Sequence, residues 1–450
     1  MPQERSRLVG LKKRVGTFAE VHLGLSKSEA VENARIFLER ERAVKGAGCP
    51  LTEDFFAVLK LLAVNDVRGA AQKLYASNPL AAVTARLAPE FFVETQVFNR
   101  KAARVSLRAL ERFLADRFSS LVKPDVKTGR YKAAVIGSGP AGLMAAAFLV
   151  RQGIAVTVFE SAPFLGGSLR CYIPEFRLPA VVLDQLLARL SADGVEFRTN
   201  VLFPRALSAE DLFEEGGFSA VLLTAGAGVA EMLGLADENA AGVMAAAEML
   251  SLTRAMHAGQ EPYTTPGFLG NRVVVVGHNE MAFDAARTAI RQGRQVTIVV
   301  AGAESDIKVP ADMVREAAEE GLKFKTFAAP VSLSLDSSGC VKGLVCRHLD
   351  YRIDGAGRLT VVEEADAEFV LEAETVLVAR GMKANTLFVS EIPGLDLNLD
   401  GSVWVKPDSS YTSARKIFAA GHLVRPGASL LDVLLDARRA ASEVAAYLKG

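Results

Sequence analysis

The chain has 450 residues, of which 50% are hydrophobic and 23% charged, and its 52 basic side chains balance its 52 acidic ones. This length accommodates about two or three domains, and zero net charge gives no reason to expect a nucleic-acid partner. No apolar run reaches the ~18 residues that a membrane span needs. The four cysteines are too few and too scattered for a disulfide framework. We therefore expect a soluble, cytoplasmic protein.

The N-terminal segment 1–130 predicts helices. Apolar residues recur at three-to-four spacing, with charges between them, in AVENARIFLERERAV, EDFFAVLKLLAV, VRGAAQKLYAS and SLRALERFLADRFSSL. The polar stretch 121–132 contains a proline and a glycine and predicts a linker. After it, short β-rich runs alternate with alanine-rich helical segments, a pattern that indicates α/β units around parallel sheets.

An internal repeat indicates two dinucleotide-type units. AAVIGSGPAGLMAAAFLVRQGIAVTVFE (133–160) aligns on VVVVGHNEMAFDAARTAIRQGRQVTIVV (273–300) without gaps, so that the offset between the two copies is constant. Gly137 falls on Gly277, and both copies carry an Arg-Gln-Gly triplet before the second predicted strand. Each copy therefore predicts a strand, a turn, a helix and a second strand.

The first copy has the features of a dinucleotide site. Residues 137–142, GSGPAG, complete the pattern G-x-G-x-x-G between a predicted strand and a helix. The glycines permit a tight turn, close approach of a pyrophosphate and close packing of helix on strand. Glu160 ends the next strand, where a carboxylate can accept hydrogen bonds from ribose hydroxyls.

The second copy departs from this pattern. In the alignment of the two copies, Asn279 replaces Gly139, Ala282 replaces Gly142 and Val300 replaces Glu160. Alanine is tolerated at the third position, but asparagine places a side chain where pyrophosphate should touch backbone. Valine offers nothing to a ribose hydroxyl. We expect weak nucleotide binding here, with NAD(H) ahead of NADP(H).

A family resemblance rests on several segments in order. GSGPAGLMAAAFLVRQG, VTVFE, GGSLRCYIPEFRLP and GVEFRTN resemble the flavin-carrying small subunit of glutamate synthase and the wider NAD(P)H-dependent FAD oxidoreductases. LLTAGAG (222–228), VLVARGMKAN (376–385) and the segment 416–448 extend the resemblance from about residue 30 to the end of the chain.

The resemblance implies an α/β fold with two dinucleotide-binding domains (Rossmann-like, ββα three-layer). The first domain would cover 131–235 and 380–450, the second, inserted in it, 236–379, and a helical ferredoxin-like domain would precede both at 1–130. The residues implied to bind FAD are Gly137, Gly139, Pro140, Ala141, Gly142, Glu160, Ser161, Gly167, Ser168, Leu169, Arg170, Ala225, Gly226, Gly421, His422, Ser429 and Leu430. Those implied for a weak NAD(H) site are Gly277, His278, Asn279, Glu280, Met281 and Ala282. No catalytic side chain and no metal ligand is expected.

The sequence also departs from the family. The N-terminal domain of such proteins holds two iron–sulfur clusters on cysteines, whereas only Cys49 remains here, and Ala88 stands where a cysteine is expected. Because a cluster needs four ligands, we expect none in this chain. His422 replaces the aspartate that binds the flavin's ribityl hydroxyls, and Ala301-Gly302 replace the paired arginines of NADPH-using relatives. Cys171 stands alone, and the other histidines, His22 among them, show no ligand spacing and are expected at the surface.

Three functional hypotheses remain open. In the first, the chain is a FAD subunit that exchanges electrons between NAD(H) and an iron–sulfur partner within a larger complex. In the second, it is a stand-alone NAD(P)H-dependent flavin reductase of a small acceptor. In the third, the nicotinamide site is not functional, and the chain is a flavin-bearing or structural subunit.

Overall fold

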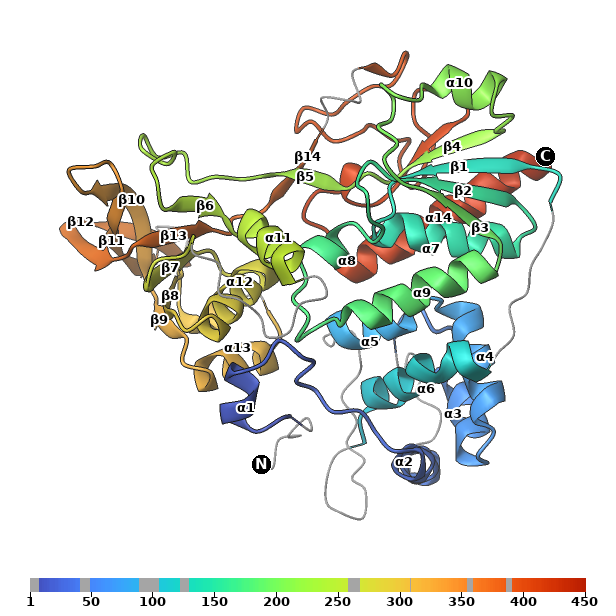
Figure 1. The fold of residues 1–450 in the computed structure, drawn as a ribbon, viewed down its shortest axis with the longest axis horizontal. Helices are drawn as coiled ribbons and strands as arrows, with labels where there is room; N and C mark the ends of the chain where they lie inside the picture. The colour runs from blue at the N-terminus through green and yellow to red at the C-terminus, as the bar shows by residue number, and fades with distance from the viewer. Residues whose placement is uncertain are drawn as a thin grey trace.

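The computed structural model describes residues 8–40, 49–88, 105–121, 129–257, 268–307, 309–353, 359–385 and 391–450. Figure 1 shows a helical N-terminal region beside two α/β units that lie next to each other. Within the described ranges, no helix is both long and apolar enough to cross a membrane.

The N-terminal region is helical, as the periodicity predicts. Its helices are α1 (Leu11–Val15), α2 (Lys27–Arg40), α3 (Phe55–Ala63), α4 (Val67–Ser77), α5 (Ala81–Leu87) and α6 (Leu107–Leu121). The carboxylates of Asp54 and Asp66 cap α3 and α4 by accepting from the N–H groups of Ala57 and Gly69. The predicted linker lies mostly outside the described residues, and the first strand begins at Lys132.

The first α/β unit contains a parallel sheet in the order β15-β4-β1-β2-β3. Its strands are β1 (Lys132–Ile136), β2 (Ala155–Phe159), β3 (Val195–Arg198), β4 (Ala220–Leu223) and β15 (Ile417–Ala419). The associated helices are α7 (Pro140–Arg151), α8 (Ser168–Cys171), α9 (Ala180–Ala192), α10 (Ala209–Glu214) and α14 (Leu430–Lys449). Strands β1 and β4 are almost wholly buried, as expected for parallel strands covered on both faces.

The second α/β unit repeats this topology in the order β6-β13-β7-β8-β9. Its strands are β6 (Val243–Ala245), β7 (Arg272–Val276), β8 (Gln295–Val299), β9 (Lys323–Lys325) and β13 (Thr375–Val378), and its helices are α11 (Ala246–His257), α12 (Glu280–Arg291) and α13 (Ala311–Glu319). The bounds of β7, α12 and β8 align with those of β1, α7 and β2 at the constant offset of the sequence repeat. The repeat inferred from the sequence is therefore confirmed element by element.

A third layer covers the second sheet. It is the antiparallel sheet of β10 (Ala328–Leu335), β11 (Val341–Ile353) and β12 (Leu359–Glu372). Val341, Leu344 and Cys346 of β11 share a buried cluster with Val274 and Val276 of β7. This arrangement confirms the three-layer prediction for the second unit.

Two crossing strands join the units. β5 (Ala227–Ala230) leaves the first unit just after β4, and β14 (Met382–Ala384) returns to it and pairs antiparallel with β5. Strand β15 then completes the first sheet beside β4. The second unit is therefore inserted in the first, as predicted.

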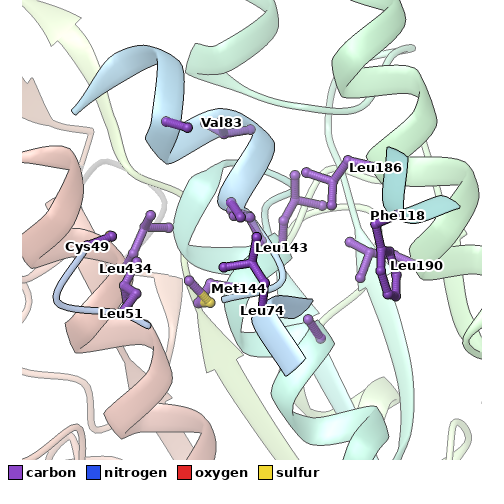
Figure 2. Packing of buried hydrophobic residues seen from close by; sticks show 14 of the residues in the cluster. Cys49, Leu51, Leu74, Val83, Phe118, Leu143, Met144, Leu186, Leu190 and Leu434 are labelled. Atoms are coloured by element: carbon purple, nitrogen blue, oxygen red, sulfur yellow. The ribbon is translucent and has the colours of Figure 1, made fainter. Parts of the chain in front are cut away.

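The helical N-terminal region shares one core with the first α/β unit. Figure 2 shows Leu143 and Met144 of α7 beside Leu74 of α4, and Leu51 beside Leu434 of α14. Burial of each such leucine stabilises the fold by about 1.5–3 kcal/mol. Helices α2 to α6 thus pack on the face of the first unit that carries α7, α9 and α14, and they support the helix that follows the first glycine-rich turn.

Candidate functional site

A cavity of about 520 Å³ opens at the carboxyl ends of β1, β2 and β4, where Ile136, Phe159 and Thr224 line it. Ligands of open α/β sheets bind at this edge. Two glycines shape the turn for steric reasons. Gly137 has a φ of 106°, and a Cβ there would lie 2.7 Å from the Thr224 carbonyl oxygen. A Cβ on Gly142 would lie 1.9 Å from the carbonyl oxygen of Gly137, so this position needs glycine for packing.

Gly139 differs, because a Cβ added to it would have no atom within 4 Å. Its φ of −70° suits any residue, so glycine is not required here by the backbone. It lines the cavity and precedes Pro140, the first residue of α7. No described side chain caps α7. The N–H groups of its first turn, with the positive end of the helix dipole, therefore remain available to an anion in the cavity.

Glu160 follows β2 at the edge of the same cavity and is held in place by hydrogen bonds. Its Oε2 accepts from the Ser138 N–H at 2.9 Å and from the Ser138 hydroxyl at 2.6 Å. Its Oε1 accepts from the Ala162 N–H at 2.9 Å. Oε1 also accepts from the Ser161 hydroxyl at 3.2 Å. Because a hydroxyl can rotate to another partner, a ribose hydroxyl can replace that of Ser161 while the other bonds keep Glu160 oriented.

Other walls of the cavity come from α8, from residues in or next to the crossing strands β5 and β14, and from His422. Gly167 has a φ of 50°, and a Cβ on it would lie 2.8 Å from the Cα of Gly139, so the chain passes close to the turn here. His422 lines the cavity, and its Nε2 lies 2.7 Å from the carbonyl oxygen of Ala428. A carbonyl can only accept, so Nε2 donates and Nδ1 is left for another partner.

Most residues predicted to bind FAD line this cavity. They are Gly137, Gly139, Pro140, Ala141, Glu160, Ser161, Gly167, Ser168, Ala225, Gly226 and His422. The cavity lining does not include Gly142, Leu169, Arg170, Gly421, Ser429 or Leu430.

Contacts explain several of these exclusions. Leu169 is buried in the core. Arg170 pairs with Asp184, and Ser429 caps α14 by accepting from the Asp432 N–H at 3.2 Å. The Gly421 N–H donates to Asp436 at 2.8 Å.

Sequence reasoning missed part of the lining. Cys171, Tyr172, Val201, Phe203, Thr224 and Asn385 all face the cavity. Thr224 and Asn385 belong to LLTAGAG (222–228) and VLVARGMKAN (376–385), two segments of the family resemblance that lead into β5 and contain β14. Their place in these segments was the signal available for them. No role is predicted for Cys171 from the sequence, and the structure places it half-buried at the cavity.

The second turn is closed by its own side chain. The Asn279 Oδ1 accepts from the Ala282 N–H at 3.0 Å, and its Nδ2 donates to the carbonyl oxygen of Ala379 at 2.8 Å. Asn279 thus caps α12 and occupies an N–H group that would otherwise be available to a phosphate. Its φ and ψ of −94° and 174° resemble the −70° and −175° of Gly139, so the backbone of the turn persists while its anion site is occupied.

The surroundings of the second turn are also unfavourable for a dinucleotide. Glu280 begins α12, and its carboxylate pairs with Arg177 of the first unit at 2.7 Å. Val300 is buried and apolar. His278 is exposed, and Met281 packs against the core of the second unit. The structure therefore brings these residues together as a turn in which the Ala282 N–H already has a side-chain partner.

Cys49 lies in a buried polar cluster of the helical region. Asn78 is at its centre and donates to Thr84 at 3.0 Å and to Glu111 at 3.1 Å, with the Cys49 Sγ 3.9 Å away. Burial, with a contribution from Glu111, raises the pKa of the Cys49 thiol to about 12. Burial also raises the pKa of Glu111 to about 8, although the hydrogen bond from Asn78 lowers it.

A neutral thiol in a hydrogen-bonded pocket is a poor metal ligand. In the parts of the chain that the structure describes, no group of three or more metal-ligating side chains occurs.

Comparison with known proteins agrees with this architecture. Residues 131–441 match the model of the pyridine nucleotide-disulphide oxidoreductase family. Residues 14–122 match a model described as dihydropyrimidine dehydrogenase domain II, 4Fe-4S cluster. This range contains a single cysteine, Cys49, and does not supply the four ligands that such a cluster needs.

Individual relatives extend the comparison. The glutamate synthase [NADPH] small chain of Escherichia coli (strain K12) is 29% identical over 98% of this chain and 96% of its own length. The NADP(+)-dependent formate dehydrogenase subunit beta of Moorella thermoacetica is 29% identical over 72% of this chain and 44% of its own. FprA of Mycobacterium tuberculosis in complex with NADPH has a TM-score of 0.58 at 19% identity, over 71% of this chain and 85% of its own, and shares the fold. The chain belongs to the pyridine nucleotide-disulphide oxidoreductase family and is similar to the glutamate synthase small chain over nearly its whole length.

Proposed function

We propose that the chain is a FAD-containing oxidoreductase subunit that transfers electrons between NAD(H) and an iron–sulfur partner of a larger redox complex. The observation that carries the proposal is the cavity beside the uncapped N-terminus of α7, with Glu160 oriented at its edge. This combination provides an anion site and a hydroxyl acceptor at the two places where a dinucleotide needs them.

The described residues fit FAD. The first turn of α7 would bind the pyrophosphate through backbone N–H groups, and the bare Cα of Gly139 leaves room for it. Glu160 would accept hydrogen bonds from the ribose, and His422 would offer Nδ1 to the ribityl chain in place of the family's aspartate. FAD supplies the redox chemistry when bound, because flavins accept hydride and also release single electrons.

The nucleotide at the second unit is proposed to be NAD(H), bound weakly. Asn279 occupies the N–H of Ala282, and Val300 provides no ribose acceptor. The carboxylate of Asp306 lies close to Gly302: a Cβ on Gly302 would be only 2.3 Å from the Asp306 Oδ2. In NADPH-using relatives, arginines stand at the positions of Ala301 and Gly302. Because a 2′-phosphate is repelled by a nearby carboxylate, NADP(H) should bind less well than NAD(H).

The proposal of an iron–sulfur partner follows from the absence of cluster-binding cysteines in this chain. The helical region keeps its fold and its packing on α7 and α14, yet it has one cysteine, which is buried and protonated. Electrons that leave the flavin singly therefore need an acceptor on another chain. The relatives named as a small chain and as a subunit beta are themselves components of larger enzymes, which supports the proposal of a complex.

One alternative has an observation in its favour. The cap made by Asn279 is also what a non-functional nicotinamide site would show. In that case the chain would carry flavin and receive electrons only through its partners.

An anaerobic titration of the FAD-loaded chain with NADH and, separately, NADPH tests these possibilities through the long-wavelength flavin absorbance. We expect slow bleaching at high NADH concentration and less with NADPH. A ferredoxin with 4Fe–4S clusters is then supplied as acceptor, with a quinone and a dye in parallel. Turnover with ferredoxin supports the proposal, whereas turnover only with the quinone or dye favours a stand-alone reductase. Absence of bleaching with either nucleotide favours the non-functional site.

A further inference from the structure

Residues 8–22, here called the strap, form the first described part of the N-terminal region, contain α1 and contact both α/β units. Figure 1 shows α1, which lies in the strap, beside α13 of the second unit. The Val9 N–H donates to the Val21 carbonyl oxygen at 3.0 Å, which closes the strap on itself. The Val21 N–H then donates to the Phe176 carbonyl oxygen of the first unit at 3.3 Å, and Phe18, Val21 and Phe176 form a small buried cluster.

The strap is bound to the second unit by charge. Arg14, only 2% exposed, pairs with Glu319 at 2.7 Å and with Glu320 at 3.1 Å. His22, which is expected at the surface, is partly exposed, and its Nε2 lies 3.3 Å from Glu316 Oε1. Glu316 lies in α13 and Glu320 directly follows it, and both are buried. The strap thus places a further cation, Arg14, beside the buried carboxylate of Glu320, which Arg287 and Arg291 of the second unit also pair with.

The same carboxylates hold two arginines of α12 against Phe176. Arg287 pairs with Glu316 at 3.0 Å and with Glu320 at 2.8 Å, and Arg291 pairs with Glu320 at 2.8 Å. The Arg291 guanidinium lies 3.8 Å from the centre of the Phe176 ring, and that of Arg287 lies 5.1 Å from it. Phe176 is fully buried. An aromatic side chain of the first unit is therefore enclosed by cations of the second.

Arg177, the next residue, reaches the start of α12. Its guanidinium pairs with Asp284 at 2.6 Å and with Glu280 at 2.7 Å. Burial would lower the pKa of Arg177, but Asp284 and Glu280 outweigh it and raise the pKa. Glu280 directly follows Asn279, the residue that caps the second turn. On the other side, Cys171 and Tyr172 of the same segment line the cavity of the first unit.

We infer that the strap, together with Phe176 and Arg177, fixes the second dinucleotide turn in one position relative to the cavity of the first unit. Arg177 is the positioning residue, because it connects the segment beside the cavity to the first turn of α12. Any rotation of the second unit would separate buried opposite charges and leave them unpaired, which is strongly unfavourable. The two sites would then act without a domain rotation, and that functional consequence rests on the proposed function.

Hydrogen exchange measured by mass spectrometry on the full FAD-loaded chain tests the inference. The variants are Arg14→Gln, Arg177→Met and Arg177→Lys, and the control is Arg198→Gln, which removes an exposed arginine paired with Glu196 in the first unit. We expect exchange in Arg14→Gln and Arg177→Met to rise about tenfold or more in peptides 8–22, 280–291 and 311–319, equivalent to about 1.4 kcal/mol of local opening. Peptides from β1, β2 and α7 should keep the wild-type rate.

Arg177→Lys retains the charge and should restore most of the protection, and Arg198→Gln should leave these peptides unchanged. Equal acceleration in both units, or none in either, would overturn the inference. The rate of flavin bleaching by NADH provides the second measurement. A lower limiting rate with an unchanged dependence on NADH concentration in Arg177→Met supports the positioning role, whereas a change only in that dependence contradicts it. If wild-type flavin is not bleached at all, the proposed function fails, while the exchange result still decides on the strap.

Discussion

Gly139 and Asn279 occupy equivalent positions in two turns with nearly the same backbone, and only Gly139 leaves the first N–H groups of its helix free. The strands and helices around the two turns have equal lengths, and both turns keep the first glycine, Gly137 or Gly277. The Asn279 side chain therefore distinguishes a turn whose helix is capped from one whose first N–H groups can bind a phosphate. Substitutions at these two positions can introduce the cap into the first turn or remove it from the second.

Gly139→Asn transfers the closed state to the first turn. The backbone accepts asparagine, and the side chain would enter the cavity and bond to the Gly142 N–H as Asn279 does to Ala282. We expect the affinity for FAD to fall at least tenfold, or about 1.4 kcal/mol, with little change in unfolding temperature of the apoprotein. Flavin content and FAD titration of the apoprotein measure this affinity.

Gly153→Asn is the control for Gly139→Asn. Gly153 lies beyond α7 with open space around it, and asparagine tolerates its φ of 76°. Equal FAD affinity in the two variants would contradict the assignment.

Asn279→Gly combined with Val300→Glu reverses the closure of the second turn. Loss of the cap costs α12 only a few tenths of a kcal/mol when glycine replaces asparagine. The new glutamate would take the place that Glu160 holds in the first unit. We expect NADH to bind roughly tenfold or more tightly, since a hydrogen bond to a charged group contributes about 1.5–3 kcal/mol. Isothermal titration with NADH measures the change. An unchanged affinity would show that another part of the second unit prevents binding.

The fold could be predicted from the sequence to a large extent because its signals are local. Alternation of valine-rich strands with alanine-rich helices and the constant offset between the two copies fix the two units, and β7, α12 and β8 begin and end where the repeat requires. The candidate FAD site was also predictable, because the positions of Gly139 and Glu160 within one strand–turn–helix–strand unit identify them.

The remaining features depend on contacts between distant segments. Asn279 reaches Ala379, which is far along the chain, and the periodicity of α12 carries no trace of this bond. Arg14 pairs with Glu319 of the second unit, and the periodicity that predicts helices in residues 1–130 gives no partner for Arg14. Cys171 and Tyr172 face the cavity because α8 turns back toward Gly139, a path set by the packing of Gly167.

The cysteines should react in the order of their exposure. Cys340 is exposed, whereas Cys49 and Cys346 are buried and burial raises the pKa of each thiol to about 12. We expect a maleimide to label Cys340 quickly in the native chain, and Cys49 only after unfolding. Peptide mass mapping gives the order, and the Cys340→Ser variant serves as the control for the fast phase. Rapid native labelling of Cys49, or iron bound to anaerobically purified chain, would contradict the assignment of a buried, cluster-free thiol.

Glu111 should make the stability of the helical region depend on pH. Its carboxyl group is completely buried, and burial raises the pKa from 4.5 to about 8 against the lowering effect of Asn78. Between these values the folded chain holds a proton that the unfolded chain has released. The free energy of unfolding should therefore fall as pH rises from about 4.5 to about 8, by at most about 1.4 kcal/mol per pH unit.

Glu111→Gln removes this dependence, because an amide stays neutral and can still accept a hydrogen bond from Asn78. Urea unfolding at pH 5 and pH 8 should show a smaller loss of stability in the variant than in the wild type, and the variant should be the more stable of the two at pH 8. Glu210→Gln, an exposed change in the first turn of α10, should leave the wild-type difference between the two pH values intact. A variant that loses as much stability as the wild type would mean that Glu111 is already ionised in the fold, with a cation beside it that compensates the charge.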